Sequence, residues 1–263
     1  MPSPLGAALR RERLVTALAL VLLTALAWLW LARGAGMAMA PRAVLDPFPH
    51  QTPPMPMPTP AWSLSGLLLA GSMWWVMMVA MMLPAAAPVI LLNAAAAPRE
   101  GPAARVRSGW FLAGYLTVWG AFSIAFAALQ LGLERSGALD LMTMGSGARW
   151  FSAAVLIATG AYQLSPLKGA CLSQCRHPAQ FLSRNYRPGS GGAFAMGVKH
   201  GAFCVGCCWL LMALLFVGGV MNLAWIALLT LLVAAEKLLP GGRWISRAAG
   251  AVCLVWGAAT ALT

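Results

Sequence analysis

The chain has 263 residues, of which 60% are hydrophobic and only 9% are charged. A soluble domain carries about 25% charged residues, so this composition excludes a water-soluble enzyme, and the high apolar content excludes a disordered chain. Six cysteines in a chain of this length also exclude a small disulfide scaffold. An integral membrane protein is the class that remains.

Apolar segments long enough to cross a bilayer recur along the whole chain. A hydrocarbon core about 30 Å thick requires about 20 apolar residues in a helix. The first such segment is 14–32, and the stretch 33–63 that follows carries eight of the eighteen prolines, which predicts an extended outer loop. We predict an all-α, polytopic transmembrane helix bundle of about seven spans. The other six spans are expected at 64–92, 110–133, 150–167, 192–219, 222–239 and 244–262.

This pattern divides the chain into an N-terminal span (1–32), a Pro/Met-rich outer loop (33–63) and a six-span membrane bundle (64–263) that would carry the metal site. The first span also resembles a signal peptide, since a basic start precedes it and the small-residue run "GAGMAMA" follows it. Its apolar run of about nineteen residues is longer than a usual signal-peptide core, which favours a span that is retained.

The basic residues fall mainly on one side of this predicted bundle. With the N-terminus in the cytoplasm, thirteen Lys and Arg lie in cytoplasmic loops and four lie in outer loops. Cytoplasmic loops of membrane proteins carry such an excess. The net charge of +12 therefore reports topology rather than a nucleic-acid partner. We expect a multi-pass protein of an inner (cytoplasmic) membrane, with the lipid bilayer around it.

The strongest chemical signal lies in the fifth span. Met196, His200, Cys204, Cys208 and Met212 recur every four residues, so they share one slowly winding face of a helix over about 24 Å. Thiolates, thioethers and imidazole suit Cu(I), and zinc is the other metal that such ligands bind. Ionisable residues in a span are costly and usually functional. These residues predict a soft-metal site, although Cys and Met also fill buried helices.

Further candidate ligands flank this row. Cys207 lies three residues after Cys204 and joins the same face. The predicted cytoplasmic loop before the span carries Cys171, Cys175 and His177, which we expect to fold back and complete a site at the inner end of the bundle.

Two ionisable residues near the cytoplasmic end of the bundle extend this prediction. Lys199, beside His200, can snorkel toward water or pair with Glu236 of the sixth span. Glu236 with Lys237 beside it also fits an ordinary span terminus, so both interpretations stay open.

The second span is rich in methionine. Met73, Met77 and Met81 follow each other at four-residue spacing, and Met78 and Met82 form a neighbouring pair. Thioethers bind Cu(I) and reject hard ions, so Met77 and Met81 are candidate ligands, although methionine also fills gaps in helix bundles. Pro84 and Pro88 free backbone carbonyls that other groups must satisfy. Three Met-x-Met pairs are expected on the outer side, as exchange sites, at Met37 and Met39, Met55 and Met57, and Met142 and Met144, together with His50.

The matching stretches "WWVMMVAMMLPAAAPVILL" and "CLSQCRHPAQF…GAFAMGVKHGAFCVGCCWLLM" resemble a bacterial family of predicted metal-binding integral membrane proteins of unknown function. The resemblance covers roughly 64–240 and includes Met-Met-Leu-Pro, His-Gly, Cys-x-x-Cys-Cys-Trp and Glu-Lys in matching order. It implies a link with copper handling. It also implies candidate metal-site positions at Cys171, Cys175, His177, His200, Cys204, Cys207, Cys208 and Glu236.

Together these observations predict a membrane protein that binds Cu(I) for transfer or for cuproprotein assembly, with a cuproprotein or a metallochaperone as partner. Two alternatives stay open: a copper transporter whose donor row lines a path, and a membrane thiol–disulfide oxidoreductase that uses the pair Cys204 and Cys207. The chain has no phosphate-binding loop, nucleophile elbow or HExxH motif, so an enzyme is the less expected class.

Overall fold

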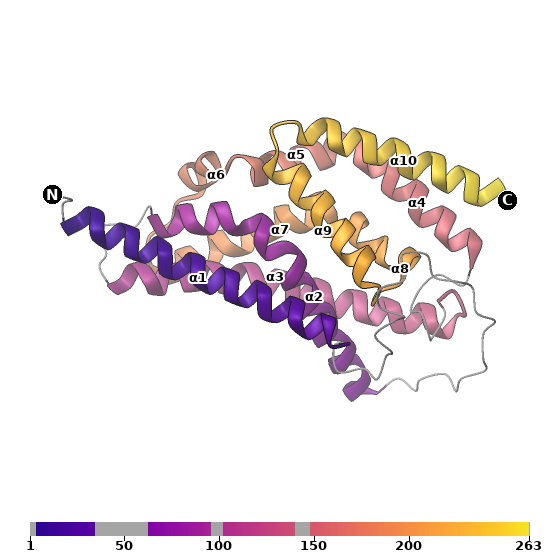
Figure 1. The fold of residues 1–263 in the computed structure, drawn as a ribbon, viewed down its shortest axis with the longest axis horizontal. Helices are drawn as coiled ribbons and strands as arrows, with labels where there is room; N and C mark the ends of the chain where they lie inside the picture. Colours follow the sequence, from indigo (N-terminus) through magenta and orange to yellow (C-terminus); the bar gives the residue numbers. More distant parts are fainter. Residues whose placement is uncertain (1–3, 35–62, 96–101, 140–147, 263) are drawn as a thin grey trace.

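The computed structural model describes residues 4–34, 63–95, 102–139 and 148–262, and these are helical apart from short connections (Figure 1). The all-α prediction is confirmed for this part of the chain. The predicted outer loop and its Met-x-Met pairs lie outside the described residues, as do His50, Met142 and Met144. The helices are α1 (Pro4–Ala32), α2 (Leu64–Ala95), α3 (Pro102–Arg135), α4 (Arg149–Leu164), α5 (Pro166–Arg176), α6 (Pro178–Asn185), α7 (Gly189–Ala213), α8 (Leu215–Gly218), α9 (Leu223–Leu238) and α10 (Gly242–Leu262).

Five helical segments of the described chain are long and apolar enough to cross a membrane: Arg13–Ala32, Leu64–Ala94, Arg107–Arg135, Gly189–Gly218 and Gly242–Leu262. The expected fourth and sixth spans correspond to α4 and α9, which have 16 residues each. At 1.5 Å per residue such a helix is about 24 Å long, shorter than the hydrocarbon core. The shortening follows from local signals, because Ser165 and Pro166 begin a new helix after α4, and Asn222 caps the start of α9.

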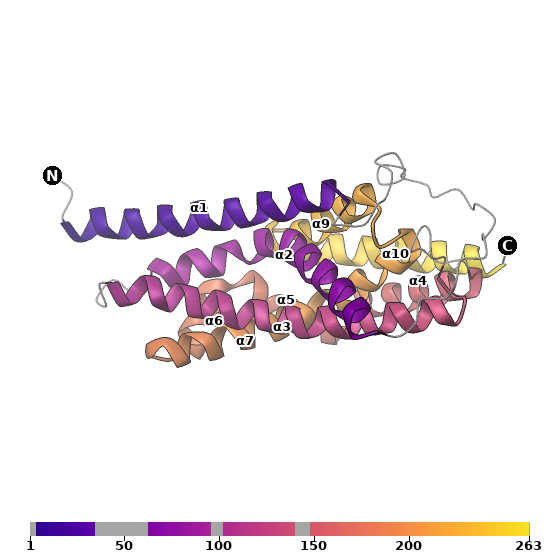
Figure 2. The same cartoon turned by 90° about the horizontal axis from the view of Figure 1, so that it is seen from below.

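Glycines allow the central helices to pack backbone against backbone. A Cβ atom on Gly197 of α7 would lie 2.0 Å from the carbonyl oxygen of Phe111 in α3. A Cβ on Gly114 of α3 would lie 2.2 Å from the carbonyl oxygen of Phe194 in α7. Small residues permit this close approach in membrane proteins. The α3–α7 pair is therefore fixed at the centre of the molecule, and Figure 2 shows α1 along one flank of the bundle.

The proline in α2 leaves a backbone carbonyl that α1 satisfies. Pro84 has no N–H group, so the carbonyl of Ala80, four residues earlier, loses its helical donor. The indole Nε1 of Trp28 donates to this carbonyl at 3.2 Å. The predicted need for an outside donor at this proline is thus met by the first helix.

The segment 171–178 was expected to be a loop, and this expectation is wrong. It lies in the short helices α5 and α6, which follow one another before α7. Each has proline in its first turn, and Ser165 caps α5 by accepting a hydrogen bond from the backbone N–H of Lys168 at 3.2 Å. The α5 helix packs against α7, and this contact brings its cysteines to the donor row.

Candidate metal centre

The donor row of α7 faces the interior of the bundle. All five of its residues are buried, with at most 2% of each side chain exposed. A helix that placed this row against lipid would leave the sulfur and imidazole groups in hydrocarbon without partners. The row is Met196, His200, Cys204, Cys208 and Met212.

Cys204 lies at the centre of the polar contacts. Its Sγ accepts a hydrogen bond from the ammonium Nζ of Lys237 at 3.0 Å and lies 3.2 Å from the hydroxyl of Tyr115. The Tyr115 hydroxyl also donates to the carbonyl of Met82 at 3.2 Å. Three helices, α3, α7 and α9, therefore meet at this sulfur, and α2 lies beside it.

The neighbouring thiols on α7 have a different role. Cys207 and Cys208 both donate to the carbonyl of Cys204, at 3.1 and 2.9 Å. The Sγ of Cys208 also lies 3.8 Å from the Sδ of Met82. We call the thiols of Cys175, Cys204, Cys207 and Cys208, together with the thioether of Met82 beside them, the thiol cluster.

The α5 helix contributes Cys175 to this cluster and holds Cys171 close by. The pKa of Cys175 lies well above its ordinary value, because the thiol makes hydrogen bonds with Cys204 and Cys207. The Sγ of Cys171 packs against Gly206, 3.0 Å from where a Cβ on that glycine would lie. Burial raises the pKa of Cys171, so this thiol stays protonated at neutral pH. His177 is exposed at the junction of α5 and α6 and does not join the cluster.

His200 is enclosed by aromatic rings one turn before Cys204. Its ring stacks on Tyr115 with centroids 5.9 Å apart and meets the edge of Phe181 at 5.0 Å. Its Nδ1 is buried and has no hydrogen-bond partner in the described structure. An imidazole nitrogen in this state is either a cost to stability or a position for a ligand.

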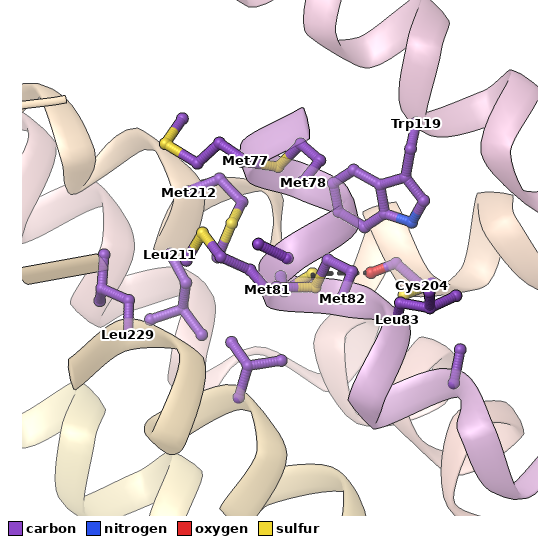
Figure 3. Close-up of a cluster of buried hydrophobic side chains, with 14 of the residues drawn as sticks. Met77, Met78, Met81, Met82, Leu83, Trp119, Cys204, Leu211, Met212 and Leu229 are labelled. Carbon is purple, nitrogen blue, oxygen red and sulfur yellow. Dashed lines mark hydrogen bonds between the residues drawn. The ribbon is translucent and has the colours of Figure 1, made fainter. Parts of the chain in front are cut away.

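The methionines of α2 form the opposite wall. Met77, Met78, Met81 and Met82 are fully buried. Figure 3 shows these four side chains gathered with Met212 and Cys204 of α7. The methionine stripe therefore continues the donor row of α7 across the core of the bundle.

Glu236 does not reach Lys199. Its carboxylate forms an ion pair with Lys168 at 2.7 Å and accepts from Gln163 at 2.8 Å. Lys168 also donates to the Gln163 side-chain oxygen. The pairing of Lys199 with Glu236 is wrong, because Lys199 lies on the exposed side of α7 and donates to Asn185 at 2.6 Å.

Sequence reasoning overlooked the polar partners of Cys204. The sequence left open whether Glu236 and Lys237 form an ordinary span terminus, yet Lys237 is only 5% exposed. The sequence carries no signal of this burial, because Leu238 and Leu239, which follow, are each 50% exposed, as expected at a helix end. Tyr115 carries no signal in the sequence either, since one tyrosine in an apolar span is common.

The donor groups fit a soft ion better than a hard one, because they are thioethers and thiols. Among the described residues, however, no three His, Cys, Asp or Glu side chains are arranged to hold one metal ion. Lys237 lies against the cluster and supplies a positive charge there. Metal binding at this cluster therefore requires side chains to move.

Comparison with known proteins supports the copper link of the site. A family model described as "PpoB2: Copper chaperone" matches residues 71–260, which include α3 to α9 and the whole thiol cluster. No curated protein and no solved structure matches the chain. The family match covers most of the chain, and the protein therefore belongs to the PpoB2 copper chaperone family.

Proposed function

We propose that the protein binds Cu(I) at the thiol cluster, within the membrane, and passes it to a cuproprotein or to a metallochaperone. The observation that carries this proposal is the convergence of sulfur groups from α2, α5 and α7 around Cys204. Cu(I) can be held by as few as two soft ligands, so the cluster offers more donors than the ion needs. Membership of a copper chaperone family supports copper as the cargo.

Zinc fits these groups less well than Cu(I). A structural zinc site requires four ligands in a tetrahedron, and the described His, Cys, Asp and Glu side chains are not arranged around a common point. The methionine thioethers beside the cysteines also favour Cu(I). His200, with its unpartnered Nδ1, is the further ligand position along α7.

The expected orientation places the N-terminus in the cytoplasm. Figure 1 shows the start of α1 and the end of α10 at opposite ends of the molecule, which agrees with an odd number of crossings. In this orientation α5 and α6 lie on the cytoplasmic side and would present Cys175 to a soluble donor or acceptor of copper.

Metal analysis of purified protein tests copper binding. We expect protein prepared with Cu(I) under reducing conditions to retain copper, and the double variant Cys204→Ser/Cys208→Ser to lose it. Cys253→Ser is the matched control, because Cys253 is a buried thiol on α10 outside the cluster, and it should retain the wild-type content. Equal, near-zero copper in all three proteins would refute the proposal.

Transport across the membrane is the second candidate, and it is favoured by one observation. The donor row of α7 is buried along its full length, and the methionines of α2 line the same core. A row of weak soft sites would let an ion move from one to the next.

A further inference from the structure

The most unusual contact of the thiol cluster is made by a cation. The Nζ of Lys237 lies 3.0 Å from the Sγ of Cys204 and 4.0 Å from the Sδ of Met82. A buried ammonium requires a counter-charge, because an unpaired ion in a low-dielectric core is strongly unfavourable. The carboxylate of the adjacent Glu236 does not serve, since it is paired with Lys168.

In the described structure the Lys237 ammonium donates to the sulfur of Cys204 and to no carboxylate. Among the acidic residues whose side chains are described, Glu134 is bonded to Gln130 and Glu236 is bonded to Lys168. The thiols of Cys207 and Cys208 direct their protons to a backbone carbonyl. Cys204 instead accepts from Lys237 and is the sulfur best placed to be a thiolate. The Lys237 ammonium therefore faces a sulfur that the proposed copper ion would bind.

We propose that Lys237 selects the charge of the bound ion and favours a monovalent soft cation over a divalent one. This inference rests on the proposed copper binding at the same cluster. When a second thiol coordinates the ion, it releases its proton to water. Two thiolates, Lys237 and Cu(I) then sum to zero, whereas Zn(II) requires a third thiol to lose its proton before the charges balance.

The environment of the cluster makes this charge count matter. Tyr115, Met82, Cys204 and Lys237 are all buried, and charge interactions are much stronger there than in water. The Lys168–Glu236 pair is compensated internally and adds no net charge. Lys237 repels a divalent ion twice as strongly as a monovalent ion at the same position, so removing its charge changes the relative affinity of the two.

The test compares Cu(I) with Zn(II), because both are closed-shell ions and differ mainly in charge. Full-length protein in detergent, reduced and free of metal, is titrated against a chromophoric chelator of each ion. We expect Lys237→Leu, which removes the charge without adding a sulfur ligand, to raise the affinity for Zn(II) relative to Cu(I) by about ten-fold or more. Lys237→Arg keeps the charge and should keep the wild-type ratio.

Lys199→Leu is the matched control, because Lys199 is an exposed lysine of α7 that bonds to Asn185. It should leave the ratio unchanged. If Lys237→Leu does not fold, as judged by gel filtration and helical circular dichroism, Lys237→Gln replaces it. An unchanged ratio in the folded neutral variant overturns the inference while copper binding by the wild type stands. A wild type that binds no Cu(I) refutes the proposed function itself.

Discussion

At the scale of single residues, the site depends on how each sulfur is hydrogen-bonded. Cys204, Cys207 and Cys208 follow one another within five positions, yet one accepts from a cation while two donate to a carbonyl. The same residue type therefore takes two roles according to its partners. A copper ion would meet one sulfur that accepts a hydrogen bond, Cys204, and two thiols that must lose their protons before they bind it.

The Tyr115 hydroxyl provides a test of this arrangement. Tyr115→Phe removes its contacts with Cys204 and with the Met82 carbonyl. We expect a loss of about 1 kcal/mol in the free energy of unfolding, together with a several-fold change in Cu(I) affinity. Thermal unfolding and chelator competition measure the two effects.

Tyr162→Phe is the control for this prediction. Tyr162 of α4 donates to the carbonyl of Gly206 on α7, and no hydrogen bond joins it to a cluster sulfur in the described structure. It should lower stability without changing Cu(I) affinity. If both variants shift Cu(I) affinity equally, then the Tyr115 hydroxyl has no special relation to the cluster.

The sequence predicts the α7 row well because a four-residue repeat has one meaning on a helix. It brings out His200, Cys204 and Cys208 together, and all are buried. Lys237 and Tyr115 could not be found in the same way. Their importance comes from helices that are distant in sequence, so their partners are fixed only by tertiary packing.

At the scale of elements, α9 organises the site through two consecutive residues. Glu236 holds Lys168 at the start of α5, and its carbonyl accepts from Arg176 at the end of α5 at 3.1 Å. Lys237 turns toward α7 and contacts Cys204. One turn of α9 thus fixes α5 at both ends and supplies the charge of the thiol cluster.

Neutralising Glu236 should loosen α5. Glu236→Gln leaves the ammonium of Lys168 buried without a counter-charge, which costs about 3–5 kcal/mol. We expect a lower melting temperature and faster alkylation of Cys175 by a maleimide. The double variant Lys168→Met/Glu236→Gln removes both charges and should recover much of the stability. Alkylation at the wild-type rate in the single variant would show that the pair does not hold α5.

Helix existence was predictable for the long apolar segments, but helix length and the structure of connections were not. Apolar content marked 150–167 and 222–239 as spans, whereas α4 ends earlier, where Ser165 and Pro166 begin a new helix, and α9 begins after its cap Asn222. The two short helices α5 and α6 are less apolar than the spans, so hydropathy alone could not distinguish them from a loop. Their folding depends on packing against α7.

At the scale of the whole molecule, burial changes the charge pattern. Arg107, Lys168 and Lys237 were counted among the thirteen cytoplasmic basic residues, and all three are buried among helices. The remaining ten still outnumber the four on the outer side, so we still expect the same orientation. The two buried lysines serve the site rather than the topology.

The donor row gives a whole-molecule prediction about transport. If copper moves along α7 and α2, proteoliposomes should take up Cu(I) faster than empty liposomes. Met212→Leu, which keeps the side-chain volume but removes the thioether, should slow uptake while the thiol cluster still binds copper. Uptake equal to that of empty liposomes would exclude transport and leave copper transfer at one face.

The close contact of α3 with α7 limits how the cluster can open. At Gly114 and Gly197 the two backbones already touch, so neither helix can slide inward or roll without a clash. The α5 helix, in contrast, is held over the thiols by the Lys168 and Arg176 side chains. The α3–α7 contact therefore forms a fixed side of the thiol cluster, and α5 is the helix that would move to let a copper ion enter or leave.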